Sequence, residues 1–145
     1  MPDLASNRRA MFDYEILERF DAGLVLTGHE AKSAKMGRFD IAGGHAIVRG
    51  NEFYLVGATI QSFQPKNAPP SHDPKRTRKF LMKRNELRYL IGKVQSGLTL
   101  MPLRAYTHRG FVKLELGLGR GRKKGDKREV IKRRETDREI QRASL

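Results

Sequence analysis

A basic stretch, GRGRKKGDKR at positions 119–128, divides this chain into two unlike parts. Before it, residues 111–118 place a valine or leucine at every second position, which is the period of a half-buried strand. The apolar positions of that alternation are Val112, Leu114, Leu116 and Leu118. After the stretch, residues 126–145 contain only scattered apolar side chains, too few to cover a helix against the rest of the protein. The sequence therefore predicts a β-rich body followed by a tail that needs an outside partner.

The charge of the chain points to the kind of partner. The chain has 145 residues, 38% of them hydrophobic, which is enough for one ordinary core. Thirty Lys and Arg against sixteen Asp and Glu give a net charge of +14, of which +6 belongs to positions 120–145 and +8 to the body. This charge exceeds what solubility requires and attracts polyanions. Nucleic acid is the expected partner of both parts.

The absence of cysteine excludes disulfides and thiolate chemistry and fits a reducing compartment. The sequence also lacks an apolar run long enough to span a bilayer, and residues 1–10 lack the hydrophobic segment of a secretory signal. We therefore expect a cytoplasmic protein with no membrane partner.

Turn and capping signals divide the body into short elements. Thr27 and Glu30 have the spacing of a helix capping box, and residues 50–51, Gly-Asn, suit a tight hairpin turn. Gly23 predicts a bend or bulge, and Pro102 suits an edge or bulge position. The expected strands are 14–22, 24–26, 45–49, 52–60, 99–106 and 111–118, the expected helices are 28–36 and 83–94, and a proline-rich exposed loop spans 61–77.

These elements predict a mainly β protein. We expect a small antiparallel six-stranded barrel of the oligonucleotide-binding type. Two or three helices flank it, and the C-terminal tail is disordered or becomes helical on binding. The predicted organisation is an N-terminal extension at 1–10, an RNA-binding body at 11–120 and a basic tail at 121–145.

Several separate motifs resemble one known family and occur in the same order. They are NRRA at 7–10, DYEI at 13–16, AGLVLTGHEAKS at 22–33, DPKRTRK at 73–79, LIGKV at 90–94, GLTL at 97–100 and GRKKGDKR at 121–128. The chain resembles small protein B, the tmRNA-binding (SsrA-binding) family of bacterial trans-translation, from residue 7 to about residue 142.

The resemblance implies an adaptor, not an enzyme, and neither a cofactor nor a metal. It implies a monomer whose barrel binds the transfer-RNA-like domain of tmRNA and delivers it, with elongation factor Tu and aminoacyl-tmRNA, to stalled ribosomes. The tail of the family becomes helical in the small-subunit decoding centre and the empty mRNA channel. The alternative is a ribosome-associated module or RNA chaperone that binds structured RNA without a rescue role.

The resemblance and the local charge together give candidate RNA-binding residues in the body. They are Asn7, Arg8, Asp21, Lys32, Lys75, Arg76, Arg78 and Lys113. Lys75, Arg76 and Arg78, with Lys79, crowd the end of the proline-rich loop, where adjacent cations suit adjacent phosphates. Glu30 and Leu81 also occupy positions associated with the RNA side of the family, but we expect Glu30 to cap its helix and Leu81 to lie in the core. Asp21 either contacts RNA or orders a neighbouring arginine.

The candidate ribosome-contacting residues all lie in the tail. They are Arg122, Lys123, Lys124, Asp126, Lys127, Arg128, Lys132 and Arg133. Two positions depart from the family pattern. Asp21 stands where relatives often have Glu, and Gly125 stands where they often have a His or Tyr that could stack on a base. Pairs such as Glu129 with Arg133 support a helix only weakly, by about 0.2–0.5 kcal/mol each, so the tail is expected to fold on contact.

A metal or general-base site is the remaining alternative. The four histidines, His29, His45, His72 and His108, with Glu30 and Asp73 supply suitable ligand types. Their spacing matches no metal motif and no phosphate-binding glycine loop is present. We therefore expect surface or turn histidines.

Overall fold

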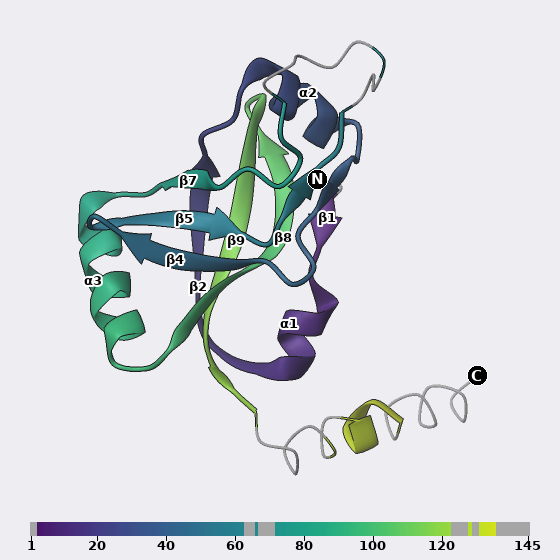
Figure 1. Ribbon diagram of the computed structural model, residues 1–145. Coiled ribbons are helices and arrows are strands. Elements are labelled where there is room, and N and C mark those ends of the chain that lie inside the picture. The colour runs from purple at the N-terminus through teal and green to yellow at the C-terminus, as the bar shows by residue number, and fades with distance from the viewer. Residues whose placement is uncertain (1–2, 63–65, 67–71, 123–127, 129–130, 136–145) are drawn as a thin grey trace.

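Two eleven-residue strands, β2 (Tyr14–Leu24) and β9 (Phe111–Gly121), run antiparallel along almost their whole length and form the centre of the sheet (Figure 1). The computed structural model describes residues 3–62, 66, 72–122, 128 and 131–135. The other elements are β1 (Ala5–Ser6), α1 (Arg8–Asp13), α2 (Gly28–Lys35), β3 (Phe39–Asp40), β4 (His45–Arg49), β5 (Glu52–Val56), β6 (Thr59–Ile60), β7 (Arg78–Leu81), α3 (Arg84–Gln95) and β8 (Thr99–His108).

The main sheet has seven strands in the order β1-β8-β9-β2-β7-β5-β4, and every pair is antiparallel. The sheet curls so that β4, at one end of this order, lies against β8 near the other end. β3 and β6 form a separate short pair. The mainly β antiparallel fold is confirmed, with seven strands in the sheet where we expected six.

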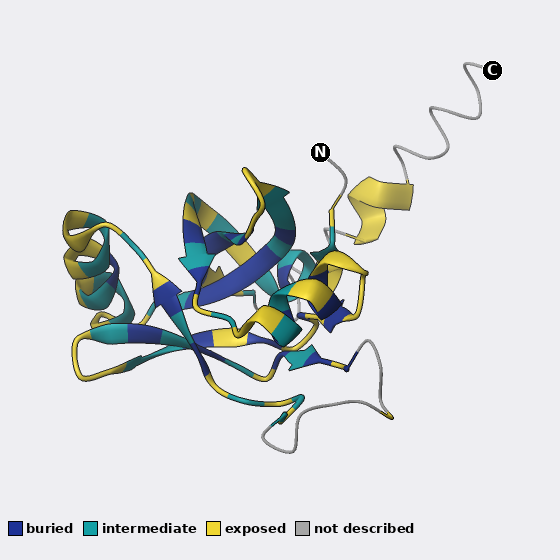
Figure 2. Cartoon of the chain, turned by 90° about the horizontal axis from the view of Figure 1, so that it is seen from above, coloured by how far each residue is buried: buried dark blue, intermediate teal, exposed yellow. Residues whose placement is uncertain are grey.

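The core follows the predicted alternation. Val112, Leu114, Leu116 and Leu118 of β9 are all buried. They pack in one cluster with Phe53, Phe80 and Leu90, which come from β5, β7 and α3. Seen from above, the buried stretches lie mainly on the strands at the centre of the molecule, whereas much of α3 and the described tail residues are exposed (Figure 2).

The strand β2 differs from expectation at two places. It continues through Gly23 without a bend, because Gly23 pairs with Lys113 of β9 and Leu81 of β7 at once. The irregularity instead falls between Ile16 and Glu18, which leaves the intervening Leu17 exposed. The predicted bulge at Gly23 is therefore wrong, while the bulge predicted near Pro102 is confirmed by the register shift between Pro102 and Arg104.

The N-terminal residues fold onto the body instead of extending from it. β1 pairs with β8, and the Asn7 side chain caps α1 by accepting from the Ala10 amide at 3.2 Å. The same side chain donates to the Pro102 carbonyl oxygen at 2.9 Å, and Ala10 is buried. Residues 5–13 are thus part of the folded body.

The local signals for helices and turns are confirmed. Thr27 and Glu30 form both hydrogen bonds of the capping box at the start of α2. Gly50 and Asn51 both have positive φ, at 57° and 63°, as the β4–β5 turn requires. In the tail, residues 128 and 131–135 are helical and exposed.

The fold makes a prediction about Gly119, which lies opposite Ile16 in the β2–β9 ladder. A Cβ at Gly119 would lie 2.8 Å from the Glu15 carbonyl oxygen, so Gly119→Ala must push the two strands apart. We expect a loss of about 1–3 kcal/mol in the free energy of unfolding, measured by urea denaturation followed by circular dichroism. Gly121→Ala is the control, because nothing lies within 4 Å of a Cβ there. Equal midpoints of urea denaturation for Gly119→Ala and Gly121→Ala would contradict this close packing.

Candidate nucleic-acid interface

The outward faces of β2, β8 and β9 carry a row of charged and aromatic side chains. Because side chains alternate along each strand, Arg19 and Asp21 of β2 face outward beside Lys113 and Glu115 of β9, with Tyr106 from β8 opposite Lys113. We call these residues, with Arg104, the outer face. A hollow of about 420 Å³ joins this face to β7 and the start of α3. Its lining includes Asp21, Leu81 and Lys113.

Ion pairs order part of the outer face. Glu115 accepts from Arg19 at 2.7 Å and from Arg104 at 3.4 Å. The Arg104 guanidinium also lies over the Tyr106 ring, 4.5 Å from its centroid. Among the described residues, no carboxylate lies within ion-pair distance of Lys113. Lys113 therefore keeps its charge available for an external anion.

In the described part of the chain, Asp21 is hydrogen-bonded to an aromatic residue and not to an arginine. The Tyr106 hydroxyl donates to Asp21 at 2.7 Å. Burial, followed by this hydrogen bond and the negative charge of Asp21, raises the pKa of Tyr106 to about 12. Tyr106 is therefore protonated at neutral pH and holds the Asp21 carboxylate in a fixed position on the outer face.

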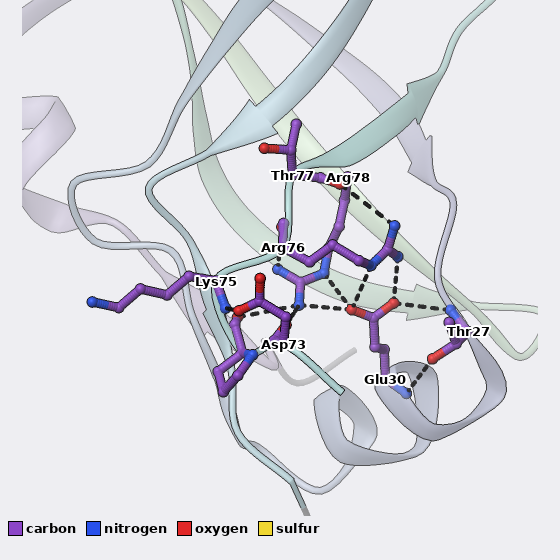
Figure 3. Close-up of polar contacts among 8 residues, drawn as sticks. Thr27, Glu30, Asp73, Lys75, Arg76, Thr77 and Arg78 are labelled. Carbon is purple, nitrogen blue, oxygen red and sulfur yellow. Dashed lines mark hydrogen bonds and ion pairs between the residues drawn. The ribbon is translucent and has the colours of Figure 1, made fainter. Parts of the chain in front are cut away.

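The second cluster surrounds Glu30 at the end of the proline-rich loop (Figure 3). Arg78 donates from Nε to Glu30 at 2.7 Å, and Arg76 donates to the other carboxylate oxygen at 2.5 Å. Arg78 also donates to the backbone oxygens of Arg76, Asp73 and Pro74 at 2.9, 3.3 and 3.2 Å. These contacts fix residues 73–78 against the start of α2.

The carboxylate of Glu30 is almost fully buried, yet it stays ionised. Burial by itself raises the pKa of Glu30, but hydrogen bonds from Arg76, the Thr27 amide and Arg78, with the charge of Arg78, lower it to about 2. The side chain is both the helix cap that we expected and the counter-ion of two arginines.

This network corrects the expected phosphate-binding cluster. Arg78 is 0% exposed and its guanidinium is used by Glu30 and by backbone oxygens, so direct contact with RNA is excluded in this conformation. Arg76 is partly exposed, but its guanidinium also pairs with Glu30. Lys79 pairs with Glu52 at 3.6 Å. Lys75 is exposed and remains a candidate for phosphate contact.

The remaining candidates lie in different environments. Asn7 is 3% exposed and both of its side-chain hydrogen bonds are internal, so its role is structural and the expected RNA contact is corrected. Arg8 and Lys32 are exposed on α1 and α2. Leu81 is 56% exposed at the hollow, contrary to the core position that we expected.

The candidates of the tail are only partly described. The Arg122 amide donates to the Asp13 carbonyl oxygen at 2.8 Å, so the β2–β9 ladder extends past the end of β9. Arg128, Lys132 and Arg133 are helical and exposed. The other predicted tail residues lie outside the described residues: Lys123, Lys124, Asp126 and Lys127.

The histidines do not assemble a metal centre in the described part of the chain. His29 and His72 meet edge to face with ring centroids 4.8 Å apart, and His29 Nε2 lies 3.0 Å from the Ser62 hydroxyl. No group of three or more His, Cys, Asp or Glu suited to a metal is found in residues 3–62 and 72–122 or the short described stretches. Over the same residues, no helix is long and apolar enough to cross a membrane.

Comparisons with known proteins identify the family. The model of the SmpB protein family matches residues 4–145. The chain belongs to the SmpB family. The SsrA-binding protein of Synechococcus elongatus is 52% identical over 141 residues, covering 97% of this chain and 92% of the relative. The SsrA-binding protein of Trichormus variabilis is 48% identical, covering 97% and 91%.

A solved structure shares the fold of the family. It is described as "tmRNA-SmpB: a journey to the center of the bacterial ribosome" and has a TM-score of 0.66 at 44% identity. The match covers 87% of this chain and 92% of that chain.

Sequence reasoning missed four residues that shape the outer face and the hollow. They are Arg19, Lys83, Arg104 and Tyr106. Tyr106 and Arg104 alternate with the buried residues Leu103 and Ala105 in β8. That alternation, compared with the alternation in β9, was a signal that could have placed both side chains beside Lys113.

The Glu30 network makes a prediction about stability and pH. Glu30→Gln leaves the buried Arg78 without its counter-ion, and we expect a loss of about 3 kcal/mol in the free energy of unfolding near neutral pH. The pKa of Glu30 falls from 4.5 to about 2 on folding. The stabilisation that ionised Glu30 gives the folded state is therefore complete above about pH 4.5 and is lost as the pH falls toward 2. In urea titrations, the difference in free energy of unfolding between the parent protein and Glu30→Gln should therefore shrink over that pH range. Glu52→Gln, which breaks a more exposed pair, should cost little.

Proposed function

We propose that this protein binds the transfer-RNA-like domain of tmRNA and delivers it to stalled ribosomes for trans-translation. It acts as a cytoplasmic adaptor without a catalytic site or a cofactor. The observation that supports this best is membership of the SmpB family over nearly the whole chain, with SsrA-binding relatives near 50% identity. In this proposal elongation factor Tu accompanies the aminoacylated tmRNA.

The body is the proposed tmRNA-binding part. Lys113 supplies a cation that no carboxylate of the described residues pairs with, and Leu81 supplies exposed apolar surface at the hollow. An RNA needs phosphate neutralisation for affinity, and it offers ribose hydroxyls and base amines to an acceptor such as Asp21. With Lys75, Lys32 and Arg8 as further cations, the outer face recognises RNA by shape and charge.

The tail is the proposed ribosome-contacting part. The described residues Arg128, Lys132 and Arg133 are exposed and helical, which suits an anionic groove. Lys123, Lys124, Asp126 and Lys127 complete the proposed set. Arg122 also belongs to the set, and its backbone amide, which donates to the Asp13 carbonyl oxygen, attaches the start of the proposed tail (121–145) to the body.

A charge substitution tests the outer face. We expect Lys113→Gln to weaken binding to the transfer-RNA-like domain and to lower the log-log salt slope by about 0.7–0.9, because one phosphate contact is lost. Filter binding over a salt series measures both. The control is Arg9→Gln, which also removes one positive charge. Arg9 is exposed, pairs with Asp13 on α1 and does not line the hollow at the outer face. Identical slopes for Lys113→Gln and the parent protein would contradict the assignment.

Removal of the tail tests the division of roles. A chain ending at Arg122 keeps every described β9 contact and should bind the transfer-RNA-like domain as the full chain does, in preference to a charge-matched RNA. It should fail to support tagging of stalled products in cells that lack their own family member. Loss of RNA binding on truncation would contradict this division. Equal binding of both RNAs by the full chain would instead favour a general RNA-binding module.

A further inference from the structure

Phe111 is the most exposed of the large hydrophobic side chains in the described part of the chain, at 71%. It begins β9 at the tip of the β8–β9 hairpin, where it pairs with His108. It belongs to neither core cluster, and no ring or cation of the described residues stacks on it. The Phe111 ring therefore contributes little to packing within the protein.

Tyr89, the other large aromatic side chain exposed among the described residues, has partners inside the protein. Its hydroxyl donates to Glu18, and its ring centroid lies 6.1 Å from that of Phe20. Lys93 Nζ lies 5.4 Å from the same centroid. A single exposed apolar side chain is common on protein surfaces, so the surroundings of Phe111 decide whether its ring has a role.

Those surroundings are cationic. Because side chains alternate along β9, Phe111 faces the same side as Lys113, while Val112 between them is buried. Arg109 is exposed in the turn that precedes Phe111. No carboxylate of the described residues lies within ion-pair distance of Lys113 or Arg109. The ring is therefore flanked along the chain by two cations that an external anion can neutralise.

The turn that carries Phe111 has a defined backbone. Arg109 and Gly110 both have positive φ, at 52° and 79°, as in the two-residue turns whose twist matches that of their strands. The ladder continues at once with the pairs His108–Phe111 and Thr107–Val112. Because the hairpin is paired up to its tip, a ligand that stacks on the Phe111 ring has little backbone to order.

An aromatic ring beside cations suits a nucleotide whose base is unpaired. Unstacked bases of RNA loops stack on aromatic side chains, whereas lysine and arginine neutralise the adjoining phosphates. A base inside a duplex has neighbouring bases on both of its faces and cannot do the same. A protein partner is disfavoured, because a stable protein interface buries about 1,000 Å² or more, far beyond what one ring at a turn provides.

We propose that Phe111 stacks on one unpaired base of the RNA that the outer face holds, with Lys113 and Arg109 against neighbouring phosphates. This inference rests on the proposed function and adds a specificity determinant to it. The cations attract any polyanion, whereas the ring selects an RNA that presents an unstacked base at the tip of the β8–β9 hairpin.

Substitutions at position 111 separate stacking from charge and from apolar contact. Phe111→Ala and Phe111→Leu should each weaken binding of the full chain to the transfer-RNA-like domain by about 5- to 150-fold, because neither side chain has an aromatic face. Phe111→Trp should bind at least as tightly as the parent protein. The log-log salt slope should stay that of the parent in all three, because no charge is removed. Parent-like binding by Phe111→Leu would overturn the proposal.

Leu17→Ala is the matched control. Leu17 is 43% exposed, and its neighbours in β2 pair with Leu118 and Gly119, at least seven residues along β9 from Phe111. The variant removes exposed apolar surface as Phe111→Ala does, but far from the tip, and should bind RNA as the parent does. Midpoints of urea denaturation should match the parent for the Phe111 variants, since the ring is outside the core. Equal losses of RNA binding in Leu17→Ala and Phe111→Ala would overturn the proposal.

A fluorescence measurement detects the stacked base directly. The chain has no tryptophan, so Phe111→Trp places a single indole at the tip of the hairpin. We expect its fluorescence to be quenched by the transfer-RNA-like domain and not by a fully base-paired RNA duplex of equal charge, because only the former can offer an unstacked base. Equal quenching by both RNAs, or no quenching by a bound transfer-RNA-like domain, would overturn the inference.

The two hypotheses fail differently. If the parent protein does not prefer the transfer-RNA-like domain, the proposed function is wrong. If it does, and Phe111→Ala binds that domain as the parent does, only the inference about Phe111 is wrong.

Discussion

The antiparallel ladder between β2 and β9 determines where almost every other feature lies. Its register sends Leu114, Leu116 and Leu118 into the core and leaves Lys113 and Glu115 outside. A slip of one residue would exchange the two faces, so burial of the leucines fixes the outer face as firmly as the core. The irregularity beside Leu17 and the close approach at Gly119 both belong to this ladder.

Internal pairing decides which cations are available to an external polyanion. The chain has a large positive charge. However, Arg78 forms an ion pair with Glu30, and Arg19 and Arg104 both pair with Glu115. Lys113, Arg84 and Arg88 have no such partner among the described residues. Affinity for RNA should depend on these cations more than on the total charge, because a cation already paired with a carboxylate gains less from a phosphate.

The sequence predicts elements whose signals are local. The alternation of 111–118, the capping box of Thr27 and Glu30 and the Gly-Asn turn each need only neighbouring residues, and all three are confirmed. β1 and β7 are short strands that exist through pairing with distant strands, so local periodicity could not reveal them. Arg78 was misassigned for a related reason. Its counter-ion is 48 residues away in sequence, and its burial arises only when α2 meets the loop.

Burial of Arg78 also determines which side chains of β7 reach the hollow at the outer face. Leu81 is exposed because β7 buries Arg78 and Phe80, which lie two residues apart and face inward, while Lys79 and Leu81 face outward. The Glu30 network that holds Arg78 therefore also fixes the side of the hollow to which Leu81 belongs. α3 begins three residues after Leu81 and contributes Glu86 to the lining of the same hollow. The buried pair of Glu30 and Arg78 therefore helps to shape the hollow at the outer face without lining it.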